Sequence, residues 1–292
     1  MSNTKIRCLF LLSAQMFLYT VGARARGPED QSFERRVGRV SSIRTDISVF
    51  SGRTGKWALG PRKPLSFEEY DFYGNLTRSV TYKPDGSLDY EWVPRGDPNE
   101  KVVFWTCNKC VRGEGRIKPG YDEQGRIIRE DTVTLEGKIV SWSVYKYDDA
   151  GNKVEELTYK GGRLPTKHAH TFDTQRNKIQ TEMYDEHGEL SARWGYRYDE
   201  AGQVVEETFY DSRGSVDTRT RYSYDNKGNL IGEAYYDKGD SFSGRTSYAY
   251  KYDSAGNWVE RTTRVLIVID KAEPFIEDAD LTEVLYRTIT YY

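Results

Sequence analysis

The sequence predicts an all-β protein in which tandem antiparallel β-hairpins form a single curled sheet. Three observations lead to this fold class. A short turn of the form YDxxG, as in Tyr147 to Gly151, recurs along the chain, and aromatic and polar residues alternate between its copies. Tyrosine is also abundant, with 23 copies in 292 residues. Tyrosine suits half-buried strands, because its ring can be covered while its hydroxyl stays hydrated.

The spacing of the repeated turn gives a period of about 26 residues. Most successive copies lie 25 to 28 positions apart, and a weaker copy lies midway in most units, so the half-period is about 13. A half-period holds one turn and one strand of ordinary length. A fixed period of this kind indicates a repeat architecture. The aromatic residue of the strongest copies falls at Tyr70, Tyr121, Tyr147, Phe172, Tyr198, Tyr224 and Tyr252.

The residues of the turn explain why it recurs. Asp favours the first position of a type I β-turn, where its carboxylate accepts a backbone N–H, and Gly favours the fourth position, where φ becomes positive. Asp148 and Gly151 occupy these two positions. A type I turn followed by a glycine bulge makes a tight hairpin. Counting outward from such turns predicts cross-strand ion pairs between Glu207 and Arg219 and between Glu233 and Arg245.

The N-terminal end predicts export. Residues 1–25 contain basic residues, an apolar run from Leu9 to Val21 and a small-x-small ending at Ala23 to Ala25, which together are typical of a secretory signal peptide. The apolar run is shorter than a membrane-spanning helix requires. We therefore expect a protein that is secreted, periplasmic or on the cell surface, with no transmembrane anchor in the mature chain.

The remaining chain divides into three predicted regions. Residues 26–69 are irregular and basic and are expected to cap the first repeat. Residues 70–264 form the β-repeat region. Residues 265–292 combine an apolar run with an alternating segment and are expected to form a closing hairpin, because a repeat sheet needs protection at its edges. The net charge of −2 does not indicate nucleic-acid binding, because a protein needs clustered Lys and Arg to bind phosphates.

The repeats resemble those of a known family. YDDAGNKVEE, YDNKGNLIGE and YDSAGNWVER are similar to the YD repeats of the bacterial RHS family, over roughly Tyr70 to Arg264. That resemblance implies an exported or cell-surface protein with a curled antiparallel sheet, which the longer members coil into a shell around a C-terminal toxin. The sequence ends at Tyr292 with no further domain, so the expectation is a short, toxin-less member.

Cys107 and Cys110 are expected to form a structural disulfide. The CNKC segment falls where the period places a turn, the ends of a β-turn lie within disulfide reach, and an exported protein would oxidise the pair. A zinc site would need two more ligands, for which His168 and His170 are the compact candidates. A redox pair is a further reading.

The function expected from these features is that of a non-enzymatic binding or scaffold module at the cell envelope, with no cofactor. Its partner would be an envelope glycan or another envelope protein, bound by aromatic residues or at a sheet edge. The alternatives are a metal-binding or hydrolytic protein using Cys107, Cys110, His168 and His170, or a stub relative of an RHS toxin. For carbohydrate binding, the candidate aromatic residues are Trp142, Trp194, Tyr196, Tyr222 and Tyr248.

Overall fold

A computed structural model describes residues 38–53, 56–92, 101–105, 113–134, 136–267 and 280–292. Every regular element within these ranges is a β-strand, and none of them contains a helix long and apolar enough to cross a membrane. The strands are β1 (Val40–Arg53), β2 (Lys56–Leu59), β3 (Lys63–Tyr70), β4 (Leu76–Tyr82), β5 (Leu88–Trp92), β6 (Lys101–Trp105), β7 (Gly113–Tyr121), β8 (Ile127–Thr134), β9 (Ile139–Tyr147), β10 (Lys153–Lys160), β11 (Thr166–Phe172), β12 (Lys178–Tyr184), β13 (Leu190–Tyr198), β14 (Val204–Tyr210), β15 (Val216–Tyr224), β16 (Leu230–Tyr236), β17 (Phe242–Tyr252), β18 (Trp258–Ile267) and β19 (Asp280–Tyr291).

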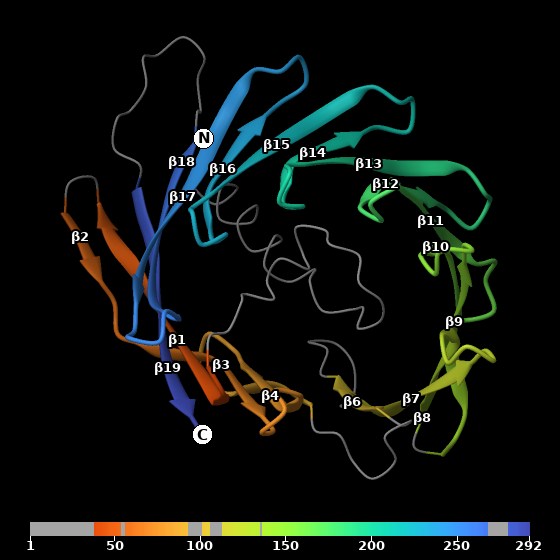
Figure 1. Cartoon of the computed structure of the whole chain (residues 1–292), viewed down its shortest axis with the longest axis horizontal. Helices are drawn as coiled ribbons and strands as arrows, with labels where there is room; N and C mark the ends of the chain where they lie inside the picture. Colours follow the sequence, from red (N-terminus) through yellow and green to blue (C-terminus); the bar gives the residue numbers. More distant parts are fainter. Residues whose placement is uncertain (1–37, 54–55, 93–100, 106–112, 135, 268–279) are drawn as a thin grey trace.

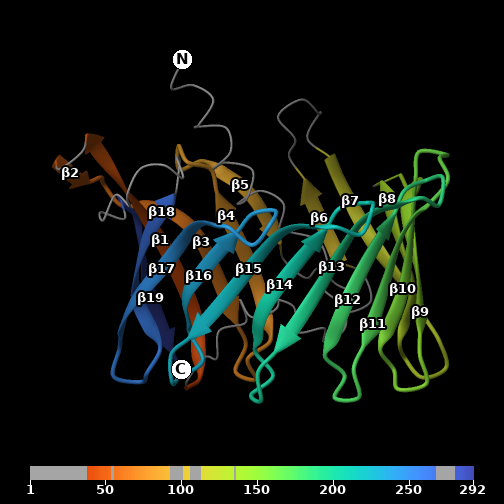
Figure 2. The ribbon, with the colours of Figure 1, turned by 90° about the horizontal axis from the view of Figure 1, so that it is seen from above.

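The strands form the predicted curled antiparallel sheet in hairpin order. From β6 to β19 each strand pairs with the next one in the chain, and β3, β4 and β5 do the same. Figure 1 looks along the axis of the resulting ring, and Figure 2 shows the strands side on. Within the described part of the chain, β5 and β6 are not paired with each other, so the ring stays open there. A large twisted sheet curls in this way because each strand is rotated relative to its neighbour.

The two ends of the chain meet at β1. This strand pairs antiparallel with β19 on one side and with β3 on the other, so it lies inside the sheet. A small apolar cluster of Val40, Ile43 and Tyr70, with Ile289 packed against it, holds this seam. The far end of β1 pairs with β2 in a two-stranded ribbon that projects from the ring (Figures 1 and 2). The N-terminal residues were expected to cap the first repeat. The β1 strand pairs with β3 at this position and pairs with β19 as well.

The predicted turn chemistry is present in the hairpins. In the turn after β9, the Gly151 N–H donates to the Asp148 carbonyl at 3.0 Å, and Gly151 has a φ of +83°. The Asp148 carboxylate accepts the Asn152 N–H and the Asn152 side-chain amide, both at 2.8 Å. These bonds hold the pKa of Asp148 below its usual value.

The predicted cross-strand ion pairs are wrong by one position. Next to the turn Tyr210 pairs with Val216, but the following pair is Phe209 with Thr218, because the bulge inserts an extra residue into one strand. Glu207 therefore faces Thr220 and Thr208 faces Arg219. Likewise, Arg245 pairs with Ala234, and Glu233 pairs with Thr246. A shift of one residue moves each predicted partner to the opposite side of the sheet.

The register divides the repeat sheet into two faces. We call the face that carries Tyr145, Glu207 and Tyr222 the tyrosine face, and the face that carries Lys146, Glu206 and Arg221 the charged face. Lys146 and Lys251 on the charged face are 66% and 72% exposed, whereas Lys153, which lies over the ring of Tyr145, is only 16% exposed. Side chains converge on the inner side of a curled sheet, so we assign the tyrosine face to the concave side.

Candidate binding face

The structure brings four of the five predicted aromatic residues onto the tyrosine face. Trp194 and Tyr196 of β13, Tyr222 of β15 and Tyr248 of β17 are on this face by their cross-strand pairing. Each is partly buried. The ring of Trp194 also contacts that of Phe209 on β14, with centroids 5.2 Å apart. The four candidates thus come from three strands that are each two positions apart in the sheet.

The fifth predicted residue, Trp142, lies on the charged face. It pairs with Tyr159 of β10 on one side and with Asp131 of β8 on the other. The rings of Trp142 and Tyr159 are stacked, with centroids 4.8 Å apart and planes at 9°. Arg129 covers the Trp142 ring at 5.5 Å. Trp142 is therefore separated from the other four candidates by the sheet itself.

Glutamates accompany the tyrosines on the tyrosine face. The Tyr145 hydroxyl donates to Glu130 at 2.6 Å, that of Tyr222 to Glu207 at 3.2 Å, and that of Tyr248 to Glu233 at 2.7 Å. Tyr235 donates to the second oxygen of Glu233 at 2.6 Å. The phenol hydroxyls thus fix the orientation of these carboxylates. Each hydroxyl also gains the hydrogen-bonding partner that a buried polar group requires.

The surroundings keep these phenols protonated. Burial raises the pKa of Tyr145, Tyr222 and Tyr248 above the usual value, and the neighbouring glutamates raise it further. A protonated phenol can donate to a carboxylate, whereas a phenolate would repel it. These tyrosines of the tyrosine face are therefore neutral hydrogen-bond donors at pH 7.

Sequence reasoning found the aromatic residues but missed the glutamates. Each of Glu130, Glu207 and Glu233 lies fifteen residues before the tyrosine that donates to it. The signal in the sequence is that Glu207 and Glu233, like Tyr222 and Tyr248, are 26 residues apart, which is the period of the repeat. The prediction placed Glu207 and Glu233 in ion pairs instead, because it lacked the register shift at the bulge.

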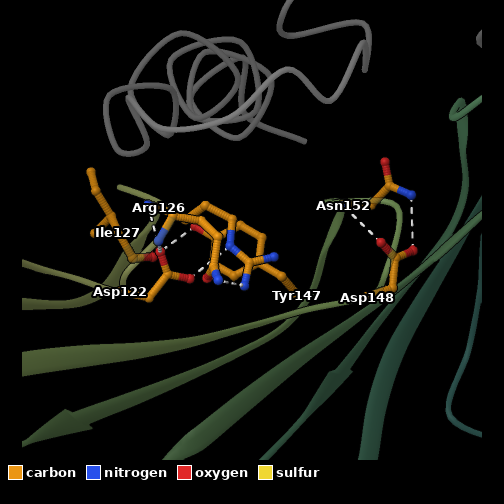
Figure 3. Close-up of polar contacts among 7 residues, drawn as sticks. Asp122, Arg126, Ile127, Tyr147, Asp148 and Asn152 are labelled. Atoms are coloured by element: carbon orange, nitrogen blue, oxygen red, sulfur yellow. Dashed lines mark hydrogen bonds and ion pairs between the residues drawn. The ribbon is translucent and has the colours of Figure 1, made fainter.

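A second set of tyrosines on this face supports the turns. The Tyr147 hydroxyl donates to the Ile127 carbonyl at 2.7 Å, and Arg126 lies 4.8 Å from the centre of the Tyr147 ring. Figure 3 shows this arrangement beside the Asp122 turn, where Arg126 also pairs with Asp122 at 2.7 Å. The same contact, from a tyrosine to the carbonyl twenty residues earlier, is made by Tyr198, Tyr224 and Tyr250. These hydroxyls therefore donate to the backbone of the sheet itself.

His168 and His170 lie on the tyrosine face of β11. Their rings are 6.5 Å apart, and the Nδ1 atom of His170 is 3.0 Å from the Thr181 hydroxyl. Burial, with Lys178 and Lys153 nearby, lowers the pKa of His170 to about 3, and burial also lowers that of His168. Both rings are neutral at pH 7. Among the described residues no group of three or more metal-binding side chains is found.

Cys107 and Cys110 lie outside the described residues, as does the predicted signal peptide of residues 1–25. The predicted disulfide and the zinc site that would include these cysteines both remain predictions. For the alternative of a metal-binding or hydrolytic protein, the structure therefore gives the positions of His168 and His170 alone.

Comparisons with known proteins show similar solved structures at low sequence identity. No family model matches the sequence, and no curated protein matches it. A porin-like protein from Bacteroides uniformis has a TM-score of 0.44 and 11% identity, over 87% of this chain and 98% of the other. A porin-like protein from Bacteroides vulgatus has a TM-score of 0.32 and 12% identity, over 88% and 99%. TcdB2-TccC3 has a TM-score of 0.23 and 15% identity, over 77% of this chain and 15% of the other. None of these likenesses indicates what this chain does.

Proposed function

We propose that this protein is an exported, non-enzymatic binding module whose tyrosine face receives a carbohydrate chain at the cell envelope. Export rests on the signal-peptide pattern of residues 1–25. Carbohydrate binding rests on one observation: Trp194, Tyr196, Tyr222 and Tyr248 share a face with carboxylates that tyrosine hydroxyls hold in place. The RHS-like repeats are consistent with a surface or secreted protein.

The chemistry of sugars fits this combination of groups. A pyranose ring presents apolar C–H groups that pack against aromatic side chains, and hydroxyls that donate to carboxylate oxygens. In a binding site lined by aromatic side chains, a small number of polar groups at fixed positions gives the site its specificity. Because Glu207 and Glu233 are already oriented, a ligand would not have to order them.

The experiment is a calorimetric titration of the mature chain, residues 26–292, with a panel of neutral envelope and plant polysaccharides. We expect saturable binding that Trp194→Ala weakens at least tenfold. Trp142→Ala is the matched control, because it removes the same side chain from the opposite face and should leave the affinity unchanged. Equal effects of the two substitutions, or no binding to any polysaccharide, would contradict the proposal. So would release of new sugar ends from a bound chain, because that would make the protein an enzyme.

A further inference from the structure

We propose that the charged face of β13 to β17 carries a second binding surface, and that its ligand is an anionic polysaccharide. The surface centres on Arg197, Arg221 and Arg245, which we call the arginine row. It lies on the side of the sheet opposite Trp194 and Tyr222, so it goes beyond the function proposed above and does not depend on it.

The register aligns the three arginines in a straight line across the sheet. Arg197 pairs with Glu206, Glu206 with Arg221, Arg221 with Ala234, and Ala234 with Arg245. Residues paired in this way are neighbours on the same face. One arginine thus lies on every second strand, and the residue between the last two is a small alanine. All three arginines are exposed.

Positive charge exceeds negative charge along this row. Glu206 is the one carboxylate in the row and is buried, and arginines from three directions approach it. The distances to its oxygens are 3.0 Å from Nε of Arg221, 3.7 Å from Nε of Arg219 and 3.9 Å from Nη1 of Arg197. Arg219 also pairs with Asp240 at 2.7 Å. In the described part of the chain, Arg245 makes no ion pair that would neutralise it.

Two lysines elsewhere on the charged face each have a carboxylate of their own. Lys146 pairs with Glu155 at 2.6 Å, and Lys251 pairs with Glu260 at 2.7 Å, each with its direct cross-strand neighbour. At the arginine row, one buried carboxylate instead serves Arg197, Arg221 and the neighbouring Arg219. The whole chain has a net charge of −2, so this local excess is not a consequence of a basic composition.

The geometry of the contacts leaves the guanidinium groups able to bind. The Arg221 bond to Glu206 uses Nε, and the side chain remains 47% exposed, while that of Arg197 is 70% exposed. The remaining N–H groups of an arginine form a planar fork that binds a carboxylate or sulfate through two parallel hydrogen bonds. Glu206 thus acts as an anchor that orients arginines whose outer edges face solvent.

The spacing of the row favours a polymer with regularly repeated anionic groups. Neighbouring strands lie about 4.8 Å apart, so arginines on every second strand are about 9.5 Å apart. That distance is close to the length of a disaccharide unit, the interval at which many acidic polysaccharides repeat their carboxylates or sulfates. Phosphates along a nucleic-acid strand follow one another much more closely.

The test measures binding of the mature chain to dextran sulfate and polygalacturonate, with uncharged dextran as the backbone control. We expect affinity for the two anionic polymers that decreases as salt is added. The variant Arg197→Gln/Arg245→Gln removes two exposed charges and leaves Glu206 with Arg219 and Arg221, so the sheet should stay intact. We expect it to bind at least tenfold more weakly, while Lys146→Gln/Lys251→Gln, which removes the same charge from the same face, binds as the parent does.

Three results would overturn the inference. They are equal binding of dextran and dextran sulfate, equal weakening by the arginine and lysine variants, and stronger binding of single-stranded DNA or anionic lipid vesicles than of either polysaccharide. Trp194 is unchanged in these variants. The two proposals can therefore fail separately. Binding of neutral polysaccharides without binding of anionic ones would contradict this inference alone, and the reverse result would contradict the function proposed for the tyrosine face alone.

Discussion

Single residues in the hairpin turns show how strictly the backbone selects its amino acids. Most copies of the turn place glycine at the fourth position, with φ between about 76° and 93° where the turn opens with Asp, as at Gly202 and Gly256. Two copies depart from this rule, with Arg176 at φ 66° and Asp240 at φ 63°. A side chain in this left-handed region is strained, because Cβ approaches the following carbonyl. Glycine avoids that strain.

Arg176→Gly should therefore stabilise the protein. The substitution relieves the left-handed strain, and the larger entropy of the unfolded chain offsets part of the gain, so we expect about 0.5–1 kcal/mol. Chemical denaturation of the two proteins measures the difference. Gly151→Ala, at φ +83° in the neighbouring copy of the turn, should have the opposite sign and a similar size. Destabilisation by Arg176→Gly would mean that the arginine side chain contributes more than its backbone costs.

Within each element, the bulge beside the turn decides which residues share a face. The alternation of Trp194, Tyr196 and Tyr198 could be predicted within one strand, because side chains alternate along any strand. The partner of each residue on the next strand depends on where the extra residue is inserted, as at Asp217, which lies opposite Phe209 and Tyr210. That insertion places Glu207 and Glu233 beside tyrosines and leaves Glu206 among arginines.

The histidine pair on β11 makes the stability of this element depend on pH. The pKa of His170 is about 3 in the folded protein, against an ordinary value of 6.5, because burial disfavours the charged ring. The unfolded chain therefore binds a proton that the folded one does not. The stability due to the neutral ring is complete above pH 6.5 and is lost as pH falls from 6.5 toward 3. Lys153 and Lys178 lower the same pKa, and His168 faces His170.

Replacing this ring should flatten the pH dependence. Between pH 6.5 and 4, His170→Gln should lose less unfolding free energy than the parent protein, by up to about 1.4 kcal/mol for each pH unit. Denaturation curves across this range give the comparison. His187→Gln is the control, because the His187 side chain is 72% exposed. If both variants follow the parent curve, the His170 ring is protonated in the folded protein at acid pH.

At the scale of the whole molecule, β1 turns an open row of hairpins into a nearly complete ring. A repeat array would expose the backbone of its first and last strands, and such edges pair readily with other chains. Here the first and last repeats both pair with β1, so two edges are removed at once. The cost is that strands more than 200 residues apart in the chain must meet, which requires a large loop closure.

The seam should therefore control the cooperativity of the ring. Ile43 is 4% exposed and packs in the cluster with Val40 and Tyr70. We expect Ile43→Ala to cost about 2–4 kcal/mol and to speed amide hydrogen exchange in β1, β3 and β19 together. Ile179→Ala, at a site 37% exposed, is the control and should cost much less. Faster exchange in β1 alone would show that the two ends of the sheet are held independently of the seam.

The sequence by itself determined the all-β class, the hairpin period and the chemistry of the turns, because these depend on residues close together in the chain. Asp and Gly fix each turn locally, and the alternation of aromatic and polar residues fixes each strand. The same local rules identified the aromatic candidates Trp194, Tyr196, Tyr222 and Tyr248.

Only the tertiary structure decided how these parts are combined. The bulge shifts every cross-strand partner by one residue, so neither the glutamates beneath the tyrosines nor the arginine row could be located by counting from the turn. Trp142 is an exception, because the alternation within β9 already places it on the face opposite Tyr145. The pairing of β1 with β19 is still less accessible to local rules, because it joins segments with more than 200 residues between them. Contacts of that range depend on how the twist accumulates over the whole sheet, and no single repeat encodes that sum.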